Sequence, residues 1–171
     1  MIRDSIPIFE SLTWIPYNAF CKMRKYSKIS NEFDFSKFGI SKKIFLSFPE
    51  NDQGLSMQLT TFGFREPLNC RYFVEFIKED DVVLEIGANI GYFAILGGTA
   101  KRIICIEPLT HAIPTLKKNL LNNGLMNKCE ILNIAVGPDG VLLLEQNDSL
   151  NLSRIVNNKS EKTVEIQSVS L

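Results

Sequence analysis

The segment from Val82 to Phe93, VVLEIGANIGYF, constrains the fold more than any other part of the chain. Its first half is a short apolar run, which is typical of a strand covered on both faces in a parallel sheet. Gly87 and Gly91 then allow the backbone to turn tightly and to approach a bound molecule before a helix begins. We therefore predict a strand, a glycine loop and a helix that form a nucleotide-type cofactor site.

Two acidic residues stand at the ends of predicted strands. Glu85 closes the first strand, and Glu107 closes a second β-branched strand within Lys101 to Pro108. Ligands of open α/β sheets bind beyond the carboxyl ends of the strands, where both carboxylates would lie. Glu107 follows Gly87 by 20 residues, close to the roughly 20-residue spacing at which an acid accepts hydrogen bonds from ribose hydroxyls. Taken alone, each feature has a plainer alternative, a solvated glutamate or a simple turn.

The glycine loop does not suit a dinucleotide. The fingerprint G-x-G-x-x-G needs glycines where this chain has Asn89 and Tyr92, and these two side chains would occupy space that a pyrophosphate needs. The Asn89 amide can instead donate or accept hydrogen bonds. The loop therefore favours an adenosine cofactor without phosphates and makes a nicotinamide dehydrogenase a distant alternative.

Three ordered motifs, EIGANIGYF, ICIEP and AVGPDG, resemble the FkbM family of class I S-adenosylmethionine-dependent methyltransferases, from about Phe64 to the C-terminus. The resemblance implies that S-adenosyl-L-methionine is the cofactor. It implies that the first acid and the glycine loop line the methionine end, that the second acid holds the ribose, and that the end of a third strand lies against the adenine. The implied cofactor-binding residues are Glu85, Gly87, Ala88, Asn89, Gly91, Glu107, Ala135 and Val136. No catalytic residue and no metal site is predicted.

The expected fold is α/β, a Rossmann-like doubly wound sheet of the class I methyltransferase type that is incomplete at the C-terminus. Residues 1–62 are expected to form an N-terminal extension of a helix and a β-hairpin, and residues 63–171 the N-terminal half of a methyltransferase domain. The 91 residues from Asp81 onwards hold about three parallel strands, because a βαβ unit takes roughly 30 residues or more. The glycine-loop strand would then have an open edge, and a complementing chain or a second copy is expected there.

Local patterns place the remaining elements. A helix is predicted from Pro16 to about Lys28, a connection over residues 31–41, and a β-hairpin whose strands carry alternating apolar residues at 44–48 and 55–59. Helices are predicted from Pro67 to about Ile77 and from Thr110 to Asn123, where Gly124 supplies the stop. Further strands are expected at 129–136, 141–144 and 162–171, with a loop at 147–160 and a turn at 137–140.

Composition suggests an ordinary cytoplasmic domain. Hydrophobic residues make up 45% of the 171 residues and charged residues 22%, and the formal net charge is zero. Without a basic block, no nucleic-acid partner is expected. No apolar run reaches the roughly 18 residues of a membrane span, although Trp14 to Ile29 has an alternative as a membrane-surface segment. The four cysteines lie far apart and form no C-x-x-C pair.

Three further residues are weaker candidates. Arg65 and Glu66 precede the helix at Pro67, where they would either contact a ligand or form a solvated pair. His111, the only histidine, is expected to be exposed. The resulting hypothesis is an O-methyltransferase, or the N-terminal portion of one, that acts on a hydroxyl of a sugar, lipid-linked or secondary-metabolite acceptor. The alternative is a truncated or split, non-catalytic product with a partial cofactor site.

Overall fold

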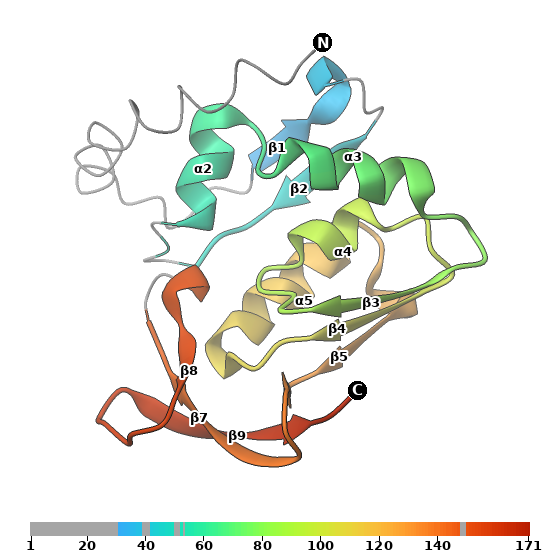
Figure 1. Ribbon diagram of the computed structural model, residues 1–171. Helices are drawn as coiled ribbons and strands as arrows, with labels where there is room; N and C mark the ends of the chain where they lie inside the picture. Colours follow the sequence, from blue (N-terminus) through green and yellow to red (C-terminus); the bar gives the residue numbers. More distant parts are fainter. Residues whose placement is uncertain (1–30, 39–41, 50–51, 53, 148–149) are drawn as a thin grey trace.

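The computed structural model describes residues 31–38, 42–49, 52, 54–147 and 150–171 (Figure 1). The helix predicted from Pro16 to Lys28, and the possible membrane-surface segment that overlaps it, lie outside these residues. Among the described residues, no helix has the length and the apolar character needed to cross a membrane.

A parallel three-stranded sheet forms the centre of the molecule. Its strands are β3 (Val82–Ile86), β4 (Arg102–Ile106) and β5 (Cys129–Leu132), in that spatial order. The connection from β3 to β4 contains α4 (Tyr92–Leu96), and the connection from β4 to β5 contains α5 (Ile113–Asn122). Short 3-10 turns, η2 (Thr110–Ala112) and η3 (Met126–Lys128), flank α5. The predicted α/β architecture and its parallel sheet are confirmed.

Helices cover one face of this sheet, so the prediction that the first strand is buried on both faces is wrong. Val82, Leu84 and Ile86 point to one side and are 60%, 45% and 52% exposed. Ile103 and Cys105 of β4 point to the other side and are fully buried. The difference arises because strand side chains alternate between faces while α4 and α5 lie on the same side (Figure 1). Within the described sheet, β3 is an edge strand.

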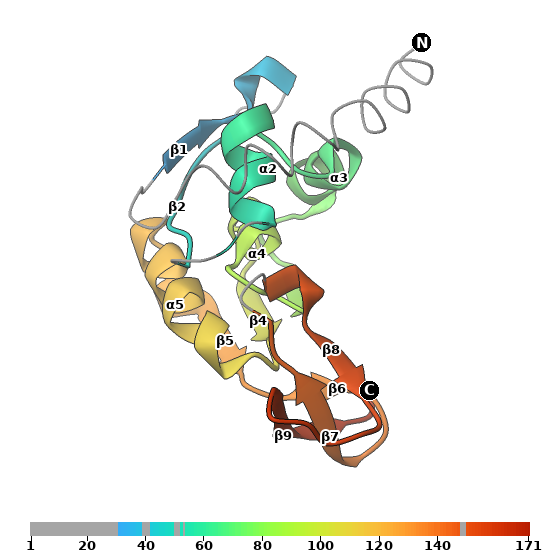
Figure 2. The same cartoon turned by 90° about the vertical axis from the view of Figure 1, so that its left-hand side faces the viewer.

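An N-terminal layer packs on the far side of α4. In it, β1 (Asn31–Asp34) pairs antiparallel with β2 (Lys43–Leu46), and η1 (Phe35–Phe38) joins them. The helices α2 (Leu55–Phe62) and α3 (Pro67–Phe76) follow. Figure 2 shows this layer at one end of the molecule, with α4 and α5 below it.

Two predictions for this layer are wrong, whereas the helix at Pro67 is confirmed. Residues 31–34 form a strand rather than a connection, and the second half of the expected hairpin is the helix α2. The Asp52 carboxylate accepts a hydrogen bond from the Ser56 amide at 2.7 Å and so caps this helix at its start. Leu55 and Leu59 are buried one helical turn apart, a spacing that also fits strand alternation.

Asn119 of α5 and Asn123, which caps the C-terminus of this helix, form hydrogen bonds with the backbone of β2 and of the residues just after it. Asn123 accepts from the Phe45 amide at 2.9 Å and donates to the Phe45 carbonyl at 2.7 Å. One turn earlier, Asn119 accepts from the Ser47 amide at 2.7 Å and donates to the carbonyls of Ser47 and Ile90 at 3.0 and 2.9 Å. Because Ile90 lies in the glycine loop, Asn119 ties that loop to the N-terminal layer.

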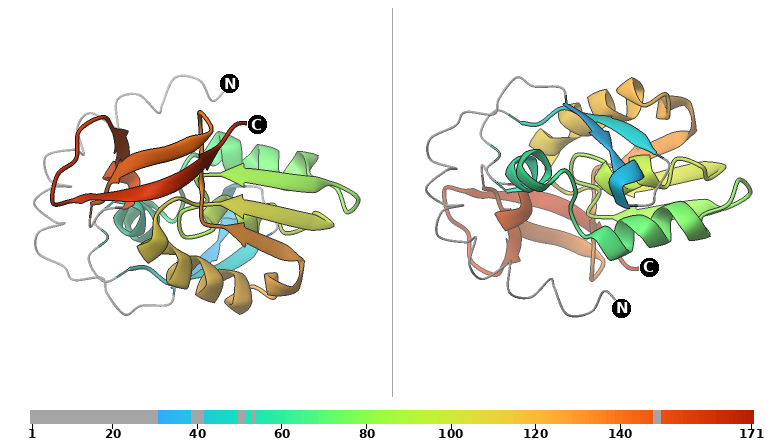
Figure 3. Two further views of the ribbon diagram at one scale, coloured as in Figure 1. Left: turned by 90° about the horizontal axis from the view of Figure 1, so that it is seen from below. Right: turned by 90° about the horizontal axis from the view of Figure 1, so that it is seen from above.

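The C-terminal part forms a second sheet of four strands, which lies beside the three-stranded sheet (Figure 3). Its order is β6-β9-β7-β8, with β6 (Ala135–Val136), β7 (Gly140–Glu145), β8 (Arg154–Val156) and β9 (Thr163–Val169), and η4 (Leu150–Leu152) precedes β8. The predicted strands at 141–144 and 162–171 are confirmed. Residues 129–136 are not one strand, because they divide between two sheets, and residues 147–160 are not all loop.

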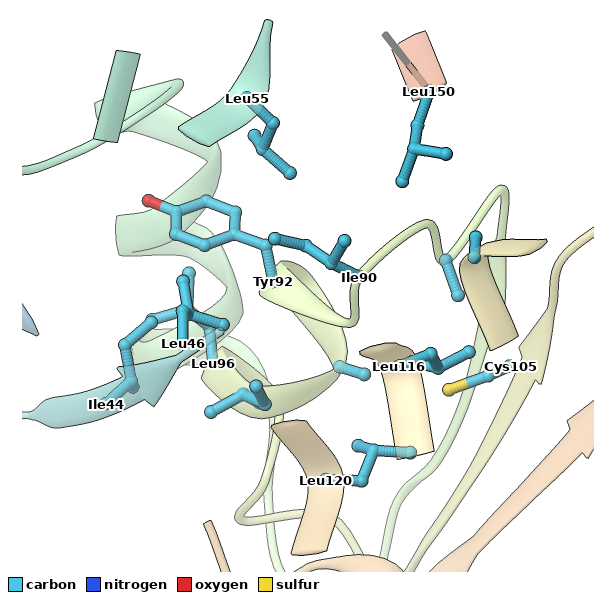
Figure 4. Close-up of a cluster of buried hydrophobic side chains, with 14 of the residues drawn as sticks. Ile44, Leu46, Leu55, Ile90, Tyr92, Leu96, Cys105, Leu116, Leu120 and Leu150 are labelled. Atoms are coloured by element: carbon cyan, nitrogen blue, oxygen red, sulfur yellow. The ribbon is translucent and has the colours of Figure 1, made fainter. Parts of the chain in front are cut away.

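The hydrophobic core joins these layers. Buried side chains from β2, the glycine loop, α4 and α5 meet in one cluster (Figure 4). Ile90, Leu96, Leu116 and Leu120 are fully buried in it. The glycine loop is therefore held by close packing on its inner side, and its other side is left to face the cavity described next.

Candidate functional site

A cavity of about 270 Å³ lies at the carboxyl end of β3. Its volume is near the lower end of the roughly 300–1,000 Å³ typical of small-molecule sites. It brings together side chains from the start of α2, the connection before α3, the end of β3, the glycine loop and α4. The lining residues are Leu55, Arg65, Glu66, Glu85, Gly87, Ala88, Asn89, Tyr92 and Phe93. Of the eight predicted cofactor-binding residues, Glu85, Gly87, Ala88 and Asn89 are in this wall.

Glu85 is a buried acid with unused hydrogen-bonding capacity. Its Oε2 atom has no partner among the described residues. Burial raises the pKa of Glu85 to about 8, although the nearby Ala94 amide favours the charged form of its carboxyl group and lowers the pKa, and the nearby Glu107 adds to the rise. A buried acceptor without a partner is costly, so this atom indicates a place where a ligand donor fits.

Asn89 and Glu66 have strained backbones. Their φ angles are 52° and 50°, and no other non-glycine residue in the described part of the chain has a positive φ. Both line the cavity, and such conformations concentrate at ligand sites. The Oδ1 atom of Asn89 is buried and, like Glu85 Oε2, has no partner among the described residues. The cavity wall therefore carries two unfilled acceptors.

The two glycines of the loop serve different purposes. A Cβ atom on Gly87, whose φ is 77°, would meet no atom within 4 Å, so this glycine borders open space. A Cβ atom on Gly91, whose φ is 85°, would lie 2.7 Å from Leu116 Cδ1 of α5. Gly91 is not in the cavity wall; it is needed because the loop packs closely on α5.

Glu107 holds the loop and does not line the cavity. Its Oε2 atom accepts from the Asn89 amide at 2.6 Å, and its Oε1 atom accepts from the Leu109 amide at 2.8 Å. Burial raises its pKa, and these two hydrogen bonds offset part of the rise. A carboxylate has about four lone-pair sites, so two remain, and its contact with a ribose stays a prediction.

Ala135 and Val136 lie in β6, where they pair with Ser168 and Val169 of β9. Neither is in the cavity wall, and their contact with an adenine also stays a prediction. His111 is exposed in η2, in agreement with the sequence analysis.

Arg65 also lines the cavity, and hydrogen bonds with the Tyr92 side chain hold its backbone in place. The Tyr92 hydroxyl lies 3.1 Å from both the amide nitrogen and the carbonyl oxygen of Arg65. The Cys70 thiol donates to the same carbonyl at 2.9 Å, and burial raises the pKa of both Tyr92 and Cys70. This contact spans 27 residues, and no local sequence pattern predicts it.

No protein-family model and no curated protein sequence matches this chain. Among solved structures, Methanocaldococcus jannaschii Trm5 in complex with adenosine is similar over 41% of this chain and 24% of its own length, with 30% identity and a TM-score of 0.37. A tRNA m1G37 methyltransferase of the same organism is similar over 57% of this chain and 32% of its own, with 22% identity and a TM-score of 0.41. The chain spans less than half the length of either structure, and likeness at this level assigns no family.

The expectation that nucleic acid has no part as a partner is wrong. It rested on the zero net charge and the scattered basic residues. The similar structures include a complex of aTrm5 with tRNALeu, which is similar over 57% of this chain and 30% of its own, with 23% identity and a TM-score of 0.41. Net charge is a poor ground for that exclusion, because phosphate contacts depend on where a few positive groups lie.

Proposed function

We propose that this chain binds S-adenosyl-L-methionine and acts in methyl transfer. The observation that carries the proposal is the unfilled Oε2 atom of the buried Glu85, at the carboxyl end of the strand that precedes the glycine loop. Glu85 Oε2 and Asn89 Oδ1 give the cavity two hydrogen-bond acceptors, so a ligand with several hydrogen-bond donors would fit it. The α-ammonium group of a methionine moiety has three such N–H donors and a positive charge that suits a carboxylate.

The character of the cavity favours the methionine end of the cofactor over a phosphate-bearing one. Glu66 lines it beside Glu85, and a carboxylate charge on Glu66 would repel a pyrophosphate. Leu55 and Phe93 provide apolar surface for the methylene groups of the methionine moiety. Because the cavity is small, it suits this end of the cofactor better than the whole molecule. The nucleoside would then extend toward Glu107 and β6.

For the acceptor, the proposal follows the FkbM resemblance. The reaction would move the methyl group from sulfur to a hydroxyl oxygen of a sugar, lipid-linked or secondary-metabolite acceptor, leave S-adenosylhomocysteine and release the hydroxyl proton. Such a displacement depends on holding the oxygen in line with the sulfur–methyl bond.

Calorimetric titration tests the cofactor. We expect S-adenosylhomocysteine to bind the 171-residue protein with a dissociation constant in the micromolar range, and NAD to show no binding. Binding of NAD without binding of S-adenosylhomocysteine would overturn the cofactor assignment.

Transfer of a labelled methyl group tests the reaction. The protein would be incubated with methyl-labelled S-adenosylmethionine and three acceptor pools: soluble saccharides, extracted glycolipids and total tRNA. Label in a hydroxyl-bearing saccharide or lipid is the expected result. Label in the tRNA pool alone would support the proposed cofactor and overturn the proposed acceptor.

A further inference from the structure

We propose that Arg65 and Glu85 together bind the amino-acid end of the ligand, with the Arg65 guanidinium on the α-carboxylate and the Glu85 carboxylate on the α-ammonium. The inference rests on the proposed function and adds a residue that the family resemblance does not supply. It makes the cavity a zwitterion site formed by two separate parts of the fold.

The backbone of Arg65 is fixed relative to the glycine loop. Tyr92 directly follows Gly91, and its hydroxyl lies at 3.1 Å from both backbone polar atoms of Arg65. Tyr92 is only 3% exposed and packs against the ring of Phe93, with a centroid distance of 5.0 Å. A shift of the glycine loop would therefore move the backbone of Arg65 with it. Two groups that bind the same ligand need such a fixed relative position.

The guanidinium is oriented but not saturated. Its Nη1 atom donates to Gln58 Oε1 at 2.6 Å, and its Nε atom donates to Glu66 Oε1 at 3.0 Å. Its Nη2 atom has no hydrogen-bond partner among the described residues, and the side chain is 27% exposed. A guanidinium held at two of its nitrogens keeps its remaining N–H donors for a carboxylate.

The neighbouring acid, Glu66, already pairs with two side chains. One carboxylate oxygen of Glu66 accepts a hydrogen bond from Arg65 Nε, and the other accepts one from the side-chain Nδ2 atom of Asn69 at 2.8 Å. Among the described residues, the wall keeps N–H donors on Arg65 and unpartnered acceptor atoms on Glu85 and Asn89, of which only Glu85 has a carboxyl group for an ammonium. An α-amino acid carries the matching pair of groups on one carbon atom, whereas a phosphate would satisfy Arg65 only and a simple amine Glu85 only.

Two adenosine thioethers isolate the role of Arg65 in binding. S-adenosylhomocysteine contains the whole amino acid, and its decarboxylated analogue retains the ammonium group but lacks the carboxylate. We expect wild-type protein to bind the analogue about 10- to 50-fold more weakly, as for the loss of one charge-assisted contact. We expect Arg65→Met to weaken S-adenosylhomocysteine binding by a similar factor and to leave the affinity for the analogue unchanged.

5′-Methylthioadenosine, which lacks the amino acid, monitors the nucleoside part of the site. Its affinity should be the same in wild type and in Arg65→Met, which also shows that the variant is folded. Arg71→Met is the matched control, because Arg71 lies on the outside of α3 and pairs with Glu75 at 2.6 Å; it should change no affinity.

Several results would overturn the inference. Equal affinity of wild type for S-adenosylhomocysteine and its decarboxylated analogue would do so without any variant. Equal weakening of both ligands by Arg65→Met would also overturn it, while the proposed cofactor would stand. If neither S-adenosylhomocysteine nor 5′-methylthioadenosine bound to wild type, the proposed function would fall first and the inference with it.

Discussion

Glu85 and Glu107 stand at the carboxyl ends of adjacent strands, yet they serve the molecule in opposite ways. Both are buried, with 8% and 3% of their surface exposed, and burial raises the pKa of both. Glu107 has a backbone amide on each oxygen. Glu85 has one oxygen with no partner in the described residues. The same residue type at nearly the same place thus holds the glycine loop in one case and keeps an unpaired oxygen in the other.

The difference follows from where each residue lies along its strand. Glu107 comes just after β4, where the chain has left the ladder and the amides of Asn89 and Leu109 are free to be bonded. Glu85 lies inside β3, opposite Cys105, and its side chain lies buried on the covered face of the sheet, near the Ala94 amide. A carboxylate in the ladder meets fewer free amides, because the ladder itself uses them.

The largest expected effect is the pH dependence of stability that Glu85 causes. Its pKa rises from 4.5 in the unfolded chain to about 8 in the folded protein, so the folded state holds its proton more tightly. The stabilisation is complete below about pH 4.5 and is lost as the pH rises through about 8, a loss on the order of 5 kcal/mol. The variant Glu85→Gln should lack this slope.

Urea unfolding of wild type and Glu85→Gln at pH 5 and pH 9 measures this pH dependence of the free energy of unfolding. The two proteins should be similar in stability at pH 5, and the variant should be the more stable at pH 9. A constant difference between the two proteins at both pH values would show that Glu85 ionises freely.

Removal of the Glu107 side chain should destabilise the protein, because it leaves the buried Leu109 amide and the partly buried Asn89 amide without an acceptor. We expect Glu107→Ala to lower the free energy of unfolding by about 3 kcal/mol at pH 7. Glu130→Ala on the adjacent strand β5 is the control, since its exposed ion pair with Arg102 is worth less than about 1 kcal/mol. Equal losses in both variants, measured by urea unfolding, would contradict a structural role for Glu107.

Sequence reasoning succeeded where the signal was local. The apolar run of β3, the glycine loop and the end of α5 at Gly124, whose φ is 68°, were all predicted from neighbouring residues. Glu85, Gly87 and Asn89 lie in one cavity wall at the end of the strand, because the chain between them is only a few residues long, and their contact with a cofactor stays a prediction.

The remaining features depend on contacts between distant segments. Asn119 bonds Ser47 across 72 residues, and Tyr92 bonds Arg65 across 27; neither partner carries a pattern of its own. The helix α2 was taken for a strand because buried Leu55 and Leu59 fit both periods. The exposed face of β3 was missed because a buried-type sequence does not tell which of its faces is covered.

Substitutions of Glu85 and Glu107 should also differ in their effects on ligand affinity, and these effects should be smaller than the effects on stability. Glu85→Gln should weaken S-adenosylhomocysteine by about 10-fold, the loss of one charge-assisted bond, and leave 5′-methylthioadenosine unchanged. Glu107→Gln should weaken both ligands by the same factor, because both contain the ribose. Calorimetry with the two ligands decides between these patterns. Loss of selectivity for S-adenosylhomocysteine in Glu107→Gln would place that acid at the amino-acid end instead.

Substitution of Asn89 should have the smallest effect on stability and ligand affinity. This residue contacts Glu107 and also lines the cavity beside Glu85. Its amide bonds Glu107, whereas its side chain carries the unfilled acceptor in the cavity of Glu85. Glycine accepts the φ of 52° and keeps the amide, so Asn89→Gly should change the free energy of unfolding by less than about 0.5 kcal/mol. Loss of the side-chain acceptor should weaken S-adenosylhomocysteine about threefold. A stable variant with unchanged affinity would remove Asn89 from the ligand site and leave its backbone bond to Glu107 as its only role.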